Sequence, residues 1–269
     1  MADVAEKRAA FRRLHEEGCF VLPNPWDVGG AKVLQHLGFP AIASTSAGYA
    51  WAQGRADNQV ELDALLRHLA ELSEAVDIPL NADFENGFAR EPEQVAANVR
   101  RAAQAGVAGL SIEDLTGEAT PALYEPPLAV ARIRAAREAL AAENVVLVAR
   151  TEGLLHGLLD LKQAIDRAVM FADAGADCIY VPGVRTPEEI TALVGAVAPK
   201  PVNVLMAWPG MSLAELAGLG VRRVSTGGAL ARRAWAAFVE AAEEIRSRGS
   251  FDAFGLPGPS IGLNKLFAE

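Results

Sequence analysis

NVVLVARTEGLLHGLLDLKQAIDRAVMFADAGADCIYVPG (residues 144–183) contains one complete structural repeat of this chain. It begins with a short apolar run (144–153), continues with a stretch of helical periodicity (161–175) and ends in a second apolar run (178–183). Gly175 stands at the end of the helical stretch, where glycine typically terminates a helix. Apolar runs without polar alternation are typical of strands that are buried on both faces. The segment therefore predicts a strand, a helix and a second, parallel strand.

The same unit recurs along the whole chain. Two further helical stretches lie at 92–106 and 127–143. The apolar runs are CFVLPN (19–24), AIASTSA (41–47), PLNADFENG (79–87), GLSIED (109–114), NVVLVARTEG (144–153), CIYVPG (178–183), VNVLMAWP (202–209) and RRVSTGG (222–228). Eight such units favour an α/β fold, the (β/α)₈ TIM barrel. An open, doubly wound sheet is the weaker alternative, because no GxGxxG motif follows the first run.

The chain is predicted to form a single barrel domain over residues 1–269, because no change in composition divides it. A charged amphipathic stretch at 1–18 predicts an extra helix before the first strand. The C-terminal tail at 250–269 is longer than a closed barrel needs. We expect it either to cap the outside of the barrel or to form an arm on a neighbouring subunit.

The charge balance excludes some classes of partner. The chain carries 25 lysines and arginines against 34 aspartates and glutamates, a formal net charge of −9. Nucleic acids and anionic membranes bind clustered basic residues, so neither partner is expected. The two cysteines, Cys19 and Cys178, have no metal-binding spacing and suit a reducing compartment. With no apolar signal segment or membrane span, the sequence predicts a cytoplasmic protein.

Acidic side chains gather where the third and fourth apolar runs end. In a barrel, functional residues lie at the carboxyl ends of the strands. Those ends carry Asp83, Glu85, Glu113 and Asp114. Carboxylates this close cannot all stay ionised without a cation, and an all-oxygen set suits Mg²⁺ or Mn²⁺. Alternatively, Glu85 and Asp114 cap helices or pair with arginines.

Arg150 closes the apolar run VVLVAR, where a guanidinium is costly to bury without an anion. It is expected to clamp a substrate carboxylate or phosphoryl group and to stabilise an enolate. The alternative is a structural bridge to Glu152, Glu113 or Asp83.

The sequence lacks the residues that two other kinds of barrel enzyme need. None of the five lysines ends a predicted strand, which argues against a Schiff-base aldolase. His15, His36 and His68 lie in helical stretches without metal-binding spacing, which argues against a zinc hydrolase. His156 follows the fifth apolar run and either lines the barrel mouth or lies on the surface.

The motifs at the strand ends, taken in order, resemble those of the isocitrate lyase/phosphoenolpyruvate mutase superfamily. They are NPWD (24–27), STSAG (44–48) with GRADN (54–58), NADFENG (81–87), SIED (111–114) and VART (148–151). The resemblance covers most of the chain. It implies a barrel whose last helix packs on a neighbouring subunit in dimers or tetramers. It also implies a bound Mg²⁺ and a small 2-oxo or tricarboxylic acid as substrate.

The resemblance assigns roles to individual positions. Asp57 is implied as a catalytic acid that reaches the metal through water. Asp83 and Glu113, with Glu85 as a supplement, are implied as the metal-binding acids. Arg150 is implied as the catalytic substrate clamp. The positions implied to bind the carboxylate of the 2-oxo acid are Thr45, Ser46 and Ala47.

Two departures from the family pattern bear on function. The family motif D-x-D reads here with Asn81 in its first position and Asp83 in its second. The lid segment (115–127) lacks the lysine, cysteine and histidine with which the true lyases do acid–base work. The leading hypothesis is a Mg²⁺-dependent carbon–carbon lyase that forms a 2-oxo acid through an enolate. The alternatives are an oxaloacetate decarboxylase or phosphonomutase-type enzyme and, third, a 2-oxo acid binding protein with little catalysis.

Overall fold

The structure, a computed structural model, describes residues 2–118, 120–255, 258 and 261–268. In this part of the chain eight strands form one parallel sheet in the order β1-β8-β7-β6-β5-β4-β3-β2. They are β1 (Phe20–Leu22), β2 (Ile42–Ala43), β3 (Leu80–Asp83), β4 (Gly109–Glu113), β5 (Val146–Arg150), β6 (Cys178–Tyr180), β7 (Val202–Leu205) and β8 (Arg223–Ser225).

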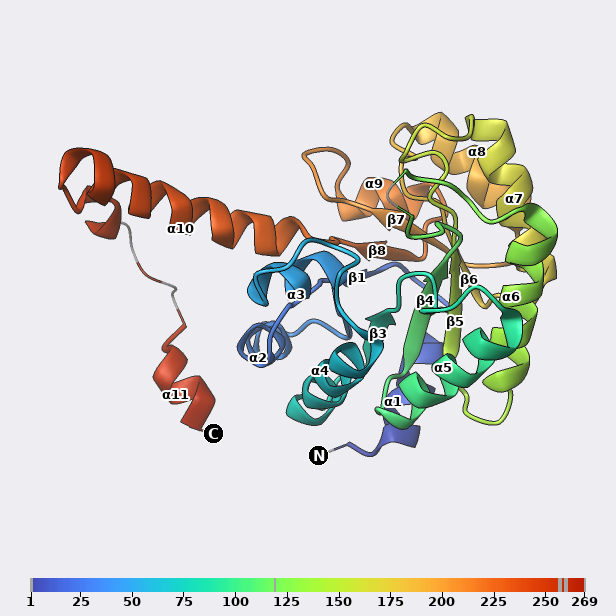
Figure 1. The fold of residues 1–269 in the computed structure, drawn as a ribbon, viewed down its shortest axis with the longest axis horizontal. Helices are drawn as coiled ribbons and strands as arrows, with labels where there is room; N and C mark the ends of the chain where they lie inside the picture. Colours follow the sequence, from blue (N-terminus) through green and yellow to red (C-terminus); the bar gives the residue numbers. More distant parts are fainter. Residues whose placement is uncertain (1, 119, 256–257, 259–260, 269) are drawn as a thin grey trace.

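The sheet curls into a nearly closed barrel (Figure 1). Its first and second strands are joined by one hydrogen bond, in which the Ala43 amide donates to the Pro23 carbonyl over 3.0 Å. The predicted TIM-type barrel is confirmed. The alternative of a doubly wound sheet is wrong, because the strands follow one another around the sheet in chain order and leave no switch point.

Helices cover the outside of the barrel, as the alternation of strands and helices predicted. They are α2 (Val28–His36), α3 (Ser46–Ala52), α4 (Leu62–Ala75), α5 (Pro92–Gln104), α6 (Pro126–Ala139), α7 (Leu161–Asp173), α8 (Pro187–Val197) and α9 (Leu213–Gly218). The predicted stretches 92–106, 127–143 and 161–175 correspond to α5, α6 and α7. Gly106 and Gly175 lie just beyond α5 and α7 with φ of 87° and 103°, the left-handed conformation that ends a helix.

Both faces of the strands are buried, which explains the unbroken apolar runs. On β5, Val146 and Val148 belong to the cluster inside the barrel with Leu22. Leu147 and Ala149 belong to the cluster between the strands and the helices. Successive side chains of a strand point to opposite faces, so each strand contributes to both layers.

The predicted N-terminal helix is α1 (Val4–Leu14), and it closes the amino-terminal end of the barrel. Phe11 is fully buried there. Lys7 Nζ donates to the carbonyls of Ser73 and Val76 at the end of α4, over 2.7 and 2.6 Å. These contacts close the barrel at the end opposite the predicted site.

The C-terminal part departs from the barrel. The long helix α10 (Ala229–Arg248) extends away from the sheet, and η1 (Asp252–Gly255) folds back on its end (Figure 1). α11 (Leu263–Ala268) returns to contact α2 on the outside of the barrel. Residues 256–257, 259–260 and 269 of the predicted tail lie outside the described residues. None of the described helices combines the length and apolar character needed to cross a membrane.

Candidate active site

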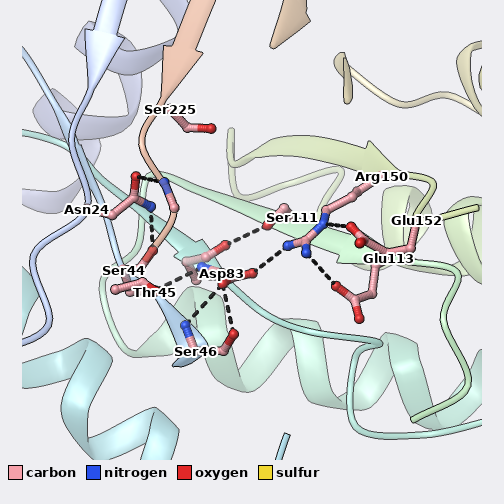
Figure 2. A network of polar contacts seen from close by, with 12 residues as sticks. Asn24, Ser44, Thr45, Ser46, Asp83, Ser111, Glu113, Arg150, Glu152 and Ser225 are labelled. Atoms are coloured by element: carbon pink, nitrogen blue, oxygen red, sulfur yellow. Dashed lines mark hydrogen bonds and ion pairs between the residues drawn. The ribbon is translucent and has the colours of Figure 1, made fainter. Parts of the chain in front are cut away.

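The strand ends bring Asp83, Glu113 and Arg150 together at one mouth of the barrel (Figure 2). Asp83, Glu113 and Arg150 are the last residues of β3, β4 and β5. In the parallel register Glu113 pairs with Arg150, and Asp83 pairs with Ser111 on the strand between. Parallel strands end at the same edge, so residues 67 positions apart in the sequence meet here.

Arg150 is surrounded by carboxylates. Its Nη1 lies 3.1 Å from Asp83 Oδ1, its Nη2 lies 3.2 Å from Glu113 Oε2, and its Nε donates to Glu152 Oε1. Burial alone would lower the pKa of Arg150, but Glu152, Glu113 and Asp83 outweigh it and hold this pKa well above its usual value. The ion pairs expected under the bridging alternative are therefore present. The Arg150 side chain is still 20% exposed, so its guanidinium remains reachable from the mouth.

The mouth holds more negative charge than Arg150 can neutralise. Burial, and then the charges of Asp83 and Asp57, raise the pKa of Glu85 to about 8. The Glu85 carboxylate makes no hydrogen bond or ion pair with any described residue, and its backbone has a left-handed φ of 44°. Loss of solvation and the nearby Asp83 charge also raise the pKa of Asp57. Burial raises the pKa of Glu113, against the attraction of Arg150.

These donors fit a hard divalent cation in their chemistry. Asp57, Asp83, Glu85 and Glu113 offer only oxygen, which Mg²⁺ and Mn²⁺ prefer, and an added cation would offset the surplus charge. Among the described residues, however, no three acidic, histidine or cysteine side chains are already gathered as a metal-binding group. Arg150 lies between Asp83 and Glu113 instead.

The contacts of Asp114 agree with the alternative in which this acid pairs with an arginine and has a structural role. It is 2% exposed and accepts hydrogen bonds from the Thr151 hydroxyl (2.7 Å) and the Glu152 amide (2.9 Å). Arg167 pairs with it over 3.2 Å. Asp114 therefore holds the backbone after β5 in place and faces away from the mouth's other acids.

Helix α3 begins shortly after β2, and its first residues lie at the mouth. Thr45 caps α3, and its hydroxyl accepts from the Gly48 amide over 3.2 Å. The amide and hydroxyl of Ser46 both donate to Asp83 Oδ2, over 3.0 and 3.1 Å. In the described part of the chain the Ala47 amide has no hydrogen-bond acceptor. Thr45 and Ser46 are thus engaged within the protein, while the Ala47 N–H remains available.

Asn81 does not belong to the mouth. Its amide oxygen accepts from Arg223 Nη1 over 3.2 Å, and its amide nitrogen donates to the Ala82 carbonyl. Arg223 also donates to the side chain of Asn203, inside the barrel. Asn81 lies two residues before Asp83 on the same strand face, so it points into the barrel one layer below.

Sequence reasoning did not identify Tyr180, which ends β6. Its ring lies 5.4 Å from the Arg150 guanidinium carbon, and it hydrogen-bonds with Ser225. Burial raises the pKa of Tyr180 to about 12, so this hydroxyl stays protonated. Its place within the sixth apolar run (178–183) was the available signal, but that run continues for three residues beyond the strand.

Asn24 joins the loops after β1 and β8. Its side-chain oxygen accepts from the amides of Thr226 and Gly227, both over 2.9 Å. Its side-chain nitrogen donates to the Ser44 carbonyl over 2.8 Å. The contact with Ser44, which follows β2, thereby bridges the gap between β1 and β2 at the mouth.

Comparisons with known proteins agree with this architecture. A family model described as phosphoenolpyruvate phosphomutase matches residues 11–246. An uncharacterized protein of Mycobacterium tuberculosis is 37% identical over 220 residues, which are 81% of this chain and 81% of that protein. An oxaloacetate decarboxylase of Rhodopseudomonas palustris is 28% identical over 230 residues, which are 81% of this chain and 76% of that protein.

Solved structures are also similar. A Burkholderia cenocepacia protein, assigned only as a lyase or mutase, is 47% identical with a TM-score of 0.93 and 99% and 97% of the two chains covered. 2,3-Dimethylmalate lyase, a member of the PEP mutase/isocitrate lyase superfamily, is 27% identical with a TM-score of 0.83, covering 100% and 94%. Oxaloacetate acetylhydrolase in complex with oxalate is 26% identical with a TM-score of 0.87, covering 100% and 94%.

Proposed function

The chain belongs to the PEP mutase/isocitrate lyase superfamily, and from this premise we propose that it is a Mg²⁺-dependent carbon–carbon lyase. The substrate is a carboxylic acid, which is cleaved through an enolate to give a 2-oxo acid. The superfamily includes lyases, oxaloacetate hydrolases and decarboxylases, and mutases.

One observation carries the proposal: a single guanidinium stands among a surplus of carboxylates. Arg150 engages Asp83, Glu113 and Glu152, and the buried Glu85 carboxylate has no polar partner among the described residues. Such a surplus is offset when a cation binds. We assign Asp83, Glu113 and Glu85 to hold the Mg²⁺, with Asp57 reaching it through water.

The remaining side chains bind and orient the substrate. The Ala47 amide, with Thr45 and Ser46 beside it, receives a carboxylate of the 2-oxo acid. Arg150 donates to the oxygen on which negative charge develops during cleavage. When bound, Mg²⁺ supplies Lewis acidity to the same oxygen. The ring of Tyr180 packs against the guanidinium and limits how far it can move.

Oxaloacetate decarboxylation is the second candidate, and the lid favours it. Leu115 and Leu123 form a bridge that folds the start of this segment, and no lysine, cysteine or histidine occurs in 115–127. Oxaloacetate loses the carboxylate that is β to its 2-oxo group, and the 2-oxo group accepts the electron pair to form the enolate. This step needs a later proton but no base to begin. The decarboxylase of Rhodopseudomonas palustris is a relative that aligns with 81% of this chain and 76% of its own length.

Membership of the superfamily also suggests where the enzyme acts and how it assembles. We propose a cytoplasmic enzyme that acts on a small acid as a homodimer or homotetramer. The net charge of −9 is unfavourable for nucleic-acid partners. The exposed aromatic residues of α10 supply a surface for a second copy.

A thermal-shift titration tests the proposal. The protein is heated with Mg²⁺ alone, with 2-oxo and tricarboxylic acids alone, and with both together. A ligand that binds only the folded state raises the midpoint. We expect stabilisation by a 2-oxo acid only when Mg²⁺ is present, followed by turnover in a cleavage assay. Binding without turnover of any acid would favour a 2-oxo acid binding protein, and no shift with any acid would overturn the proposal.

A further inference from the structure

His156 lies directly beside the Arg150 site. It follows β5 in a tight turn, in which the His156 amide donates to the Glu152 carbonyl over 3.1 Å. The turn brings the imidazole back over the Glu152 side chain, with 3.5 Å between His156 Nε2 and Glu152 Oε2. The His156 side chain is 35% exposed, whereas that of Glu152 is 2% exposed. The imidazole therefore contacts the buried Glu152 on one side and is open to solvent on the other.

Glu152 connects this imidazole to the substrate clamp. One carboxylate oxygen accepts from Arg150 Nε and the other faces His156 Nε2. A buried carboxylate at one ring nitrogen selects the tautomer and leaves the other nitrogen free to exchange a proton. Glu152, through its hydrogen bond, also raises the pKa of His156 above its usual value. Glu152 and Arg150 are the charged groups that act on it.

The other histidines lie elsewhere. The His15 ring packs against Phe11 at the closed end of the barrel, with centroids 4.7 Å apart. The His68 ring stacks on Tyr49 at 3.8 Å, away from the carboxylates, and His36 ends α2. Since the lid offers no lysine, cysteine or histidine, the imidazole of His156 is the one placed at the Arg150 site.

We propose that His156 is a catalytic acid of this enzyme and gives the proton that quenches the enolate. The inference rests on the proposed function and adds a proton donor to it. In this step the imidazolium N–H bond breaks, the enolate carbon gains a C–H bond, and the electron pair of the enolate closes the 2-oxo group. Neutral imidazole remains and recovers a proton from water. In the reverse direction, with pyruvate bound, neutral His156 removes a proton from C3 of pyruvate, and the enolate forms.

The backward step gives a direct test. Wild type, with Mg²⁺ and pyruvate in D₂O, is followed by NMR for exchange of the pyruvate methyl protons. Binding of pyruvate and of oxalate is measured on the same samples by calorimetry. We expect the wild type to exchange these protons. The variant His156→Asn should lose at least about 100-fold in exchange rate, the usual size of a general acid–base contribution. It should bind oxalate within about twofold of wild type, and His36→Asn is the matched control.

Each outcome decides something different. Exchange that survives in His156→Asn would overturn the role of His156 and leave the lyase proposal standing. Wild type that binds pyruvate with Mg²⁺ but exchanges no protons would also overturn it. Wild type that binds neither ligand would overturn the proposed function itself and this inference with it.

A second readout requires no turnover. The pKa of His156 is measured by NMR titration of the imidazole in wild type and in Glu152→Gln. Glu152 raises the pKa of His156, so removing its charge should lower that pKa. An unchanged pKa would show that Glu152 does not hold the imidazole, and the proposed arrangement would be wrong.

Discussion

Arg150 and Asp83 join the fifth strand to the third across the barrel mouth, with 3.1 Å between Nη1 and Oδ1. The other oxygen of Asp83 accepts from both the amide and the hydroxyl of Ser46. The clamp, an acid proposed to bind the metal and the start of α3 are thus one connected unit. A change in the position of Arg150 is transmitted to each of them.

Replacing Arg150 should lower kcat strongly rather than only weaken substrate binding. Arg150→Ala removes the donors to the developing enolate oxygen, a loss of about 10²–10³-fold in kcat for one such group. Arg150→Lys keeps the charge but not the planar fork, so we expect little recovery. Steady-state kinetics with Mg²⁺ measure both variants, with Arg134→Met on the exposed face of α6 as the control. Full activity in Arg150→Ala would exclude the proposed site.

Glu85→Gln should stabilise the metal-free protein. The pKa of Glu85 is raised from 4.5 to about 8, so the folded state binds more protons than the unfolded state between these values. Stability contributed at low pH is therefore lost as the pH rises from about 4.5 to about 8, with a cost of about 3 kcal/mol at pH 7. Urea unfolding in EDTA should show most of this gain in Glu85→Gln at pH 7 and little of it at pH 4.5.

Added Mg²⁺ should stabilise wild type more than Glu85→Gln. If Glu85 helps to hold the ion, saturating Mg²⁺ raises the unfolding midpoint of wild type more than that of Glu85→Gln. The control is Glu138→Gln, at the exposed end of α6. Equal Mg²⁺ shifts in wild type and Glu85→Gln would remove Glu85 from the proposed metal site.

His68 should make the protein sensitive to acid. Burial lowers the pKa of His68 from 6.5 to about 4, and its Nε2 is buried with no hydrogen-bond partner in the described part of the chain. Below about pH 6.5 His68 takes up a proton in the unfolded chain but not in the folded state. The free energy of unfolding therefore falls by about 2 kcal/mol at pH 5. His68→Phe keeps the ring stacked on Tyr49 and should lose less stability between pH 7 and pH 5 than wild type. Parallel pH dependence in urea unfolding of the two proteins would contradict this.

The surface of α10 should hold two copies of the chain together. Trp235 and Phe238 are 40% and 64% exposed, and Trp235 lines a groove of about 940 Å³ together with Trp51 and Val239. Monomeric proteins rarely leave so continuous an apolar surface in water. We expect light scattering to find a dimer or tetramer for wild type and a smaller species for Phe238→Asp. Ala141→Asp, at an exposed turn, carries the same added charge and should leave the assembly unchanged.

Local sequence patterns were sufficient to predict the barrel. Unbroken apolar runs separated by helical stretches imply parallel strands with both faces covered, and the observed sheet order follows. The same reasoning located Asp83, Glu113 and Arg150, because each ends an apolar run and parallel strands end at one mouth. It also gave Asp114 a structural alternative, which its contacts with Thr151 and Arg167 bear out.

Sequence alone determined that Asp83, Glu113 and Arg150 reach the mouth, because strand direction and the two-residue repeat of a strand are local properties of the chain. The tertiary structure decided what each of them meets there. Arg150 could have faced a ligand or any of three acids, and it contacts all three. Asn81 turns inward to Arg223, and His156 turns back over Glu152. Distances between segments far apart in the chain set these partners and the resulting pKa values, and no local pattern encodes such distances.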